Sequence, residues 1–223
     1  MDKTAIILFA NLPDFEARAK SFSGFSSKKA TQKISSVLTQ HFYSLAKQTS
    51  ADSFLIDSYH QKGKSFGERI TNAFIDIYAK SYENIICIGN DCPELNLNQL
   101  QNAINLVEQG NVVLGPTLDG GAYLMGIPKN KFNCSTFLNV KWQSIKTYQN
   151  LKQVFNNFVT ELSLQVDIDS VEDLKTNYAN NSLINVLRHL ILSFKNKLSD
   201  LLNLTLIDFI KVDRYSLKAP PLA

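Results

Sequence analysis

The sequence is poor in cysteine and histidine, the residues that build disulfide frameworks and zinc sites. Its three cysteines, Cys87, Cys92 and Cys134, are too few and too irregularly spaced for a disulfide framework. The three histidines lie far apart and lack the paired spacing of zinc ligands. Unpaired cysteines are typical of a reducing compartment, so we expect a cytoplasmic protein.

Dense basic clusters and long apolar runs are also absent. The 23 Lys and Arg residues against 20 Asp and Glu give a net charge of +3, and the basic residues are scattered. A nucleic-acid binder would gather them into a patch, so we expect no nucleic-acid partner. The apolar run near the start is too short for a signal peptide, and no run is long enough to span a membrane. The sequence therefore predicts no transmembrane segment.

The chain does contain short apolar runs that alternate with helical patterns. This alternation predicts an α/β fold with three layers, in which helices cover both faces of a mainly parallel central sheet. Strands are expected at residues 5–10, 54–56, 85–88, 112–114, 122–127 and 164–168, and helices at 29–47, from about 70, at 98–109 and at 145–158.

The pattern changes near residue 178. Residues 1–178 carry the alternation and are expected to form one domain, whereas 179–223 are expected to be a C-terminal helical extension with an irregular tail. Apolar residues recur there at helical spacing, and such a helix would pack on the domain, on a second copy in a homodimer, or on a membrane surface. This apolar seam consists of Leu183, Leu187, Ile191, Phe194, Leu198 and Leu201.

The stretch IICIGNDCPEL, residues 85–95, ends an apolar run in a carboxylate. The run stops at Gly89-Asn90-Asp91, and Pro93 prevents it from continuing. In open parallel sheets, ligands bind outside the carboxyl ends of the strands, so Asp91 is expected to face a pocket. A turn or a helix cap is the plain alternative for an Asp at this place.

A second carboxylate, Asp119, is followed by the pair Gly120-Gly121 between two apolar runs. Adjacent glycines mark a turn with positive φ or a place where the backbone approaches a ligand closely. An ordinary β-hairpin explains the same residues.

Two further carboxylates stand in the segment VDIDSVEDL. Asp167 and Asp169 alternate with Val166 and Ile168, which places both carboxylates on one side of a strand. Like charges at this spacing repel, and a divalent cation would relieve the repulsion. Solvent at an exposed edge is the alternative.

Two loops carry candidate phosphate-binding residues. Arg18 and Lys20 follow the first strand, where they would hold a phosphate or stand as solvated charges at a helix start. Residues 61–69 form a glycine-bearing loop that enters a helix, and a helix N-terminus can receive an anion. This loop has neither a P-loop pattern nor the Rossmann glycine fingerprint.

In chain order, the pieces QxGxxFGERI, IGNDCPEL, LGPTLDGGAYLMGI, KWQS and VDIDSVEDL resemble a bacterial family of nucleotide-diphospho-sugar-transferase-like proteins with the GT-A fold, also called selenodomain-associated transferases. The resemblance covers about the first three quarters of the chain. It implies a Rossmann-like GT-A fold and a divalent cation, Mg²⁺ or Mn²⁺, that neutralises the departing diphosphate.

The resemblance also implies roles for individual residues. Asp91 would hold the metal together with Asp169, with Asp167 as the substitute, and Asp91 and Asp119 are the catalytic candidates. The expected nucleotide or substrate contacts come from Asn11, Arg18, Lys20, Gln61, Arg69, Asn90, Gly120 and Gly121.

One loop departs from the family. Members carry a Pro-Gly turn and a Lys-Thr-Arg triplet after the first strand, whereas this chain reads PDFEARAKSF, with Glu16 near the expected glycine. Arg18 and Lys20 would have to replace the triplet for the diphosphate to bind.

Three functions follow. The leading hypothesis is metal-dependent transfer of a sugar from a nucleotide-diphospho-sugar to an unidentified acceptor. The second is a nucleotidyltransferase acting on a phosphorylated small molecule, which requires a triphosphate and a strongly basic loop. The third is a degenerate GT-A domain that binds without catalysing, which the altered first loop favours.

Overall fold

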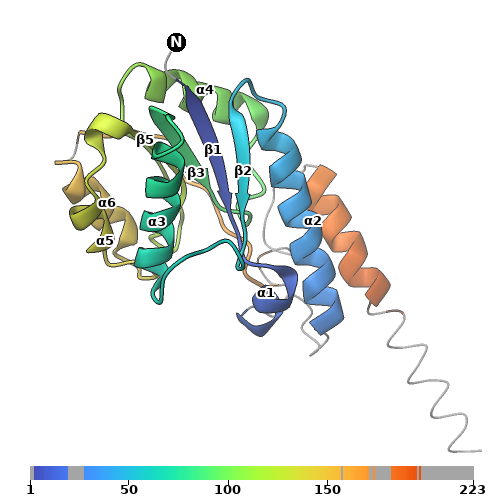
Figure 1. Cartoon of the computed structure of the whole chain (residues 1–223). Coiled ribbons are helices and arrows are strands. Elements are labelled where there is room, and N and C mark those ends of the chain that lie inside the picture. The colour runs from blue at the N-terminus through green and yellow to red at the C-terminus, as the bar shows by residue number, and fades with distance from the viewer. Residues whose placement is uncertain are drawn as a thin grey trace, which may run out of the picture.

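The computed structural model describes residues 3–19, 28–156, 158–170, 173, 182–194 and 196. They form a six-stranded sheet between two layers of helices, which confirms the predicted three-layer α/β fold (Figure 1). The strands are β1 (Thr4–Phe9), β2 (Asp52–Ile56), β3 (Asn84–Ile88), β4 (Val113–Pro116), β5 (Ala122–Pro128) and β6 (Thr160–Glu161). The helices are α1 (Pro13–Ala19), α2 (Lys28–Ala46), α3 (Phe66–Tyr78), α4 (Leu97–Glu108), the short 3-10 helix η1 (Lys129–Lys131), α5 (Cys134–Leu138) and α6 (Thr147–Val154).

The sheet is mainly parallel, with the strand order β2-β1-β3-β5-β4-β6. β1 pairs in parallel with β2 and β3, and β4 pairs in parallel with β6. Among the described strands, only β5 runs the other way, antiparallel to β3 and β4. The carboxyl ends of β1, β2, β3 and β4 therefore lie at one edge of the sheet.

Local sequence signals fix several helix ends. α3 begins at a capping box in which Ser65 and Glu68 bond each other's backbone, and α4 begins at the equivalent pair Asn96 and Gln99. Gly110 follows α4 with φ +84°, the left-handed conformation that glycine adopts after a helix. These helices lie where the sequence predicts them.

Two predicted elements differ in the structure, which also contains α1, η1 and α5, where the sequence predicted no helix. The last strand was expected at 164–168, but β6 is Thr160–Glu161 and Gln165 makes only an isolated bridge to Thr117. After Gln165 the chain leaves the sheet, and the N–H of Ile168 donates to the carbonyl of Asp91, 2.7 Å away. α6 is shorter than the predicted helix at 145–158, and at its C-terminal end Asn156 adopts a positive φ, which ends a helix.

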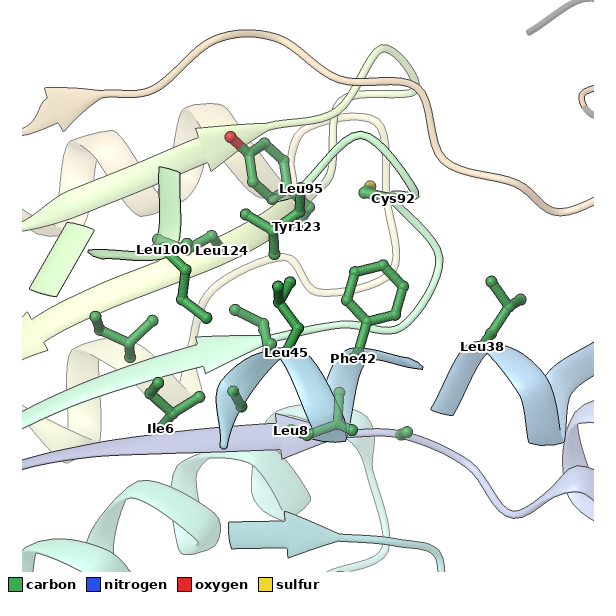
Figure 2. Close-up of a cluster of buried hydrophobic side chains, with 14 of the residues drawn as sticks. Ile6, Leu8, Leu38, Phe42, Leu45, Cys92, Leu95, Leu100, Tyr123 and Leu124 are labelled. Carbon is green, nitrogen blue, oxygen red and sulfur yellow. The ribbon is translucent and has the colours of Figure 1, made fainter. Parts of the chain in front are cut away.

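The core consists of two apolar clusters, one on each face of the sheet. Side chains alternate across β1, so that Ile6 and Leu8 join α2 and α4 on one face while Ala5 and Ile7 join α3 on the other. Figure 2 shows the first cluster, where Phe42 of α2 and Leu100 of α4 pack with Leu8. All five residues of β3 are buried, as expected for a strand covered on both faces.

Residues 182–194 form a further helix, which lies beside α2 (Figure 1). Its buried residues Leu183, Ile184, Leu187 and Ile191 belong to the same cluster as β1 and α2. The expected boundary at residue 178 stays a prediction, since residues 174–181 lie outside the described part, as does the tail from 197. Within the described residues, no helix is both long enough and apolar enough to cross a membrane.

Candidate functional site

A cavity of about 450 Å³ opens at the carboxyl edge of the sheet. This volume falls in the range of about 300–1,000 Å³ that is typical of small-molecule sites. Its wall includes the ends of β1 and β3, the turn between β4 and β5, the start of α3 and the segment after β6. The place agrees with the prediction that the pocket lies outside the strands' carboxyl ends.

Asp91 lines this cavity at the exit of β3. A Cβ at Gly89 would lie 3.0 Å from Asp91 Oδ1, so glycine leaves room for the carboxylate. The Asn90 amide donates to Thr39 Oγ1 at 2.9 Å and ties the loop to α2. The carbonyl of Asp91 receives the N–H of Ile168, which joins this loop to the segment that carries Asp167 and Asp169.

Asp119 lies in a tight turn, Thr117–Gly121, that joins β4 to β5. The turn is the antiparallel hairpin that the sequence allowed, and its Asp also lines the cavity. Asp119 Oδ1 accepts from the Thr117 hydroxyl and from the N–H of Gly121 (2.9 Å). Gly120 has φ +90°, and a Cβ there would overlap the carbonyl oxygen of Ile145.

Asp167 and Asp169 both line the cavity, although their segment is not a regular strand. Burial raises the pKa of Asp167 from 3.8 to about 6, and the charges of Asp119, Asp91 and Asp169 add to the shift. Four carboxylates from three separate segments therefore repel one another in one cavity. Asp169 also precedes a reciprocal cap, in which Ser170 and Asp173 bond each other's backbone, as the sequence indicated.

We tested whether these carboxylates fit a divalent cation. In the described part of the chain, no group of three or more His, Cys, Asp or Glu side chains is arranged to hold a metal ion by itself. Mg²⁺ does not need such a cage, because it usually takes one or two carboxylates and completes its shell with substrate phosphate and water. Several carboxylate oxygens in the wall of one cavity fit this mode of binding.

The expected nucleotide contacts have mixed outcomes. Gln61 lines the cavity, and its amide donates to the carbonyls of Ala10 (3.1 Å) and Ile56 (3.3 Å), holding the ends of β1 and β2 together. Arg69 lines the cavity, donates weakly to the Lys64 carbonyl (3.4 Å), and has a buried Nε with no partner among the described residues. Gly121 and Asn90 also line the cavity, whereas Gly120 packs against Ile145.

The first loop brings an acidic residue to the cavity. Asn11 lines the wall and donates to Glu16 Oε2 at 2.9 Å, and Glu16 itself is buried and lines the wall. Arg18 lies in α1, but its side chain is outside the described part, and Lys20 is outside it altogether. The predicted phosphate roles of Arg18 and Lys20 stay predictions.

Glu16, Trp142 and Gln143 are among the lining residues that the sequence did not identify as site residues. The sequence pointed to Glu16 only as a residue near the glycine expected from the family resemblance. Trp142 stands out as the only tryptophan of the chain. Trp142 and Gln143 both belong to the piece KWQS that carries the family resemblance, but the left-handed backbone of Gln143, with φ +54°, is visible only in the structure.

A family model matches residues 30–144, just over half of the chain and including Arg69, Asp91, Asp119 and Trp142. The chain belongs to the DUF2064 family. The family is described as an uncharacterized protein conserved in bacteria, and the matched region includes the cavity from the loop after β2 to Gln143. No curated protein matches the chain significantly.

Solved structures share the fold. A crystal structure from Desulfovibrio desulfuricans G20, described as a "putative nucleotide-diphospho-sugar transferase", has a TM-score of 0.70 at 20% identity and covers 87% of this chain and 99% of its own. This similarity confirms the GT-A-like fold. More distant is Rv0371c of Mycobacterium tuberculosis H37Rv in complex with manganese, with a TM-score of 0.41 at 11% identity, covering 78% of this chain and 97% of its own. A CMP:2-keto-3-deoxy-manno-octonic acid synthetase with CTP has a TM-score of 0.41 at 8% identity and covers 78% of this chain and 95% of its own.

Proposed function

We propose that this DUF2064 protein is a metal-dependent transferase that moves a sugar from a nucleotide-diphospho-sugar to an acceptor. The observation that carries the proposal is the convergence of Asp91, Asp119, Asp167 and Asp169 in one cavity at the carboxyl edge of the sheet. Burial raises the pKa of Asp167 to about 6 and the charges of its neighbours add to the shift, and a cation would relieve this repulsion between carboxylates. The fold shared with the Desulfovibrio protein is consistent with this function.

The proposed metal ligands are Asp91 and Asp169, with Asp167 beside them. The hydrogen bond from Ile168 to the Asp91 carbonyl fixes the two segments against each other, so their carboxylates are held in register before a ligand arrives. When bound, a Mg²⁺ or Mn²⁺ ion would neutralise the charge of the departing diphosphate.

Arg69 is the proposed diphosphate contact of the protein itself. It is the only basic residue among the described residues that line the cavity, against five carboxylates including Glu16. It lies on α3, whose first turn also borders the cavity, and among the described residues its guanidinium makes only a long hydrogen bond of 3.4 Å, to the Lys64 carbonyl. A guanidinium is suited to this contact because it donates in a planar fork.

Asp119 is the proposed base. Both hydrogen bonds that hold it go to Oδ1, and no described group donates to Oδ2. In the reaction, the acceptor oxygen would bond to the anomeric carbon while the bond from that carbon to the diphosphate breaks. Asp119 Oδ2 would take the proton that the acceptor hydroxyl loses.

A second candidate function is favoured by Glu16. Its buried carboxylate lines the cavity at the end of β1, where the family has a glycine and a basic triplet. A negative charge at this place weakens diphosphate binding, and it weakens triphosphate binding more. The observation therefore favours a domain that binds without catalysing over a nucleotidyltransferase.

Calorimetric titration tests the leading proposal. UDP, GDP, CDP and their sugars would be titrated with and without Mn²⁺, and one base is expected to bind only when Mn²⁺ is present. Asp91→Asn and Asp169→Asn should each weaken this binding about tenfold or more, since even outer-shell partners of metals have effects of this size. Asp76→Asn serves as the control. Asp76 is on α3 and forms an exposed ion pair with Lys62, so this variant should bind the nucleotide as the wild type does. Failure of the wild type to bind any nucleotide would remove the transferase.

Product analysis separates the candidates. Transfer of the sugar releases a nucleoside diphosphate, whereas nucleotidyl transfer releases pyrophosphate from a triphosphate. A protein that binds a nucleotide-sugar but yields neither product with a panel of acceptors would support the binding domain.

A further inference from the structure

We infer that Trp142 and Gln143 form the subsite that holds the pyranose ring of the donor sugar. The inference rests on the proposed function and goes beyond it, because it places the sugar at two residues of the loop between α5 and α6. Both side chains line the cavity, and neither is part of the carboxylate cluster.

Trp142 is fixed in one orientation. Its indole N–H donates to the Phe137 carbonyl at 3.1 Å, and its ring centre lies 5.0 Å from that of Phe137 and 5.5 Å from that of Phe66. A Cβ at Gly67 would lie only 2.7 Å from the indole Cδ1, so glycine permits this close packing. Because the N–H is already bonded, the indole offers the cavity apolar ring surface. The C–H face of a pyranose packs on such a surface.

The backbone of Gln143 is strained. It has φ +54°, a backbone conformation that residues other than Gly, Asn and Asp rarely adopt, and the residue is exposed. The strain persists because the loop is held from both sides, by Ser144 Oγ donating to the Lys141 carbonyl (2.6 Å) and by Thr147 Oγ1 donating to the same carbonyl (2.9 Å). Strain that is maintained in this way is characteristic of functional sites.

The amide of Gln143 has the chemistry that a sugar requires. It carries two donors and an acceptor, and sugar hydroxyls both donate and accept. Among the described residues, it makes no side-chain hydrogen bond, so the amide is available to a ligand. An aromatic face beside an uncommitted amide is an amphipathic surface that matches a pyranose better than it matches an apolar ligand.

The subsite lies between Arg69, the proposed diphosphate contact, and Asp119, the proposed base. On one side, Trp142 contacts Phe66 and Gly67 of α3, the helix that carries Arg69. On the other, the loop is joined to the Asp119 turn, because the N–H of Tyr148 donates to the Gly120 carbonyl at 2.9 Å. A donor sugar is bonded directly to its diphosphate and is attacked by the acceptor, so its ring must lie between those groups. A nucleobase stacked on Trp142 would be a different arrangement, and the test distinguishes it.

The test compares a nucleoside diphosphate with the corresponding nucleotide-sugar. Both would be titrated in the presence of Mn²⁺ into the full-length wild type, Gln143→Gly and Lys146→Ala, and the melting temperature of each variant would be measured. Gln143→Gly should weaken nucleotide-sugar binding about tenfold while nucleoside diphosphate binding stays within about twofold. Its melting temperature should not fall, because glycine adopts φ +54° without strain. Lys146→Ala, an exposed change in the same loop, should resemble the wild type.

Each other outcome overturns the inference. Unchanged nucleotide-sugar affinity in Gln143→Gly would show that the amide does not contact the sugar. An equal loss for both ligands would assign the loop to the base or the diphosphate, and the proposed transferase would then stand without this subsite. A wild type that binds neither ligand would remove the proposed function and the subsite together.

Discussion

Asp167 illustrates at the scale of one residue how a site of this kind reduces stability. Its carboxylate is half-buried and faces Asp119, Asp91 and Asp169, so its pKa rises from 3.8 to about 6. An acid whose pKa is higher in the folded state binds protons more tightly there than in the unfolded chain. The charged carboxylate therefore lowers the free energy of unfolding, increasingly as the pH rises from about 4 through 6, and the penalty is complete above that range.

We predict that Asp167→Asn stabilises the protein at pH 7. A shift of this size would correspond to about 3 kcal/mol for a fully enclosed group. Solvent screening at a half-buried position reduces the expected gain to about 1 kcal/mol. Urea denaturation at pH 7 and at pH 4 measures it, and most of the gain should be lost at pH 4, where the folded-state carboxyl is protonated and the unfolded one is about half protonated. A variant less stable than the wild type at pH 7 would contradict the proposed repulsion.

At the scale of an element, the turn between β4 and β5 joins two parts of the site. Its Gly120 lies against the carbonyl of Ile145, and this contact sets the Asp119 turn against the loop of Trp142 and Gln143. The pair Gly120-Gly121 predicted either a positive φ or a close approach of backbone, and Gly120 has both. In this case the close neighbour is another segment of the chain.

We predict that Gly120→Ala destabilises the protein more than Gly110→Ala does. Both glycines have positive φ, so each alanine adds strain of about 1–2 kcal/mol. Gly110 has nothing within 4 Å of its missing Cβ, whereas a Cβ at Gly120 overlaps the Ile145 carbonyl. The displacement at Gly120 should cost about 2 kcal/mol more, comparable to overpacking in a core. Urea denaturation of both variants measures the difference in their free energies of unfolding. Equal losses of stability would show that the turn moves away from the Ile145 carbonyl without cost and would contradict the prediction.

At the scale of the whole molecule, the helix at 182–194 is part of the main core. Ile184 and Leu187 are fully buried in the cluster that also contains Ile6 and Phe42. A helix that shares a core with the first strand should unfold with it in one transition. A single transition would mean that the predicted boundary at residue 178 does not separate two independently folding units.

We predict that Leu187→Ala lowers the free energy of unfolding by about 2–4 kcal/mol, the usual cost of emptying a core position. Leu192→Ala makes the same change at a position of the same helix that is 56% exposed, and should cost less than about 1 kcal/mol. Urea denaturation followed by circular dichroism and by Trp142 fluorescence measures both. Small, equal effects would mean that the segment from 179 onward folds independently of the domain.

The four central site carboxylates were predictable because each follows a local pattern. Asp91 ends an apolar run, Asp119 precedes two glycines, and Asp167 and Asp169 alternate with apolar residues. In the structure, all four line one cavity. Their catalytic and metal-binding roles stay predictions.

The sequence by itself determined the order of strands and helices, the helix caps and the positions of these carboxylates, because apolar periodicity and turn chemistry are properties of neighbouring residues. Only the tertiary structure decided that β5 runs antiparallel, that the chain leaves the sheet after Gln165, that Glu16 is buried and that Gln143 is strained toward the cavity. Each of these features depends on contacts between segments far apart in the chain. The energy that maintains them comes from the packing of the whole molecule, which no local pattern records.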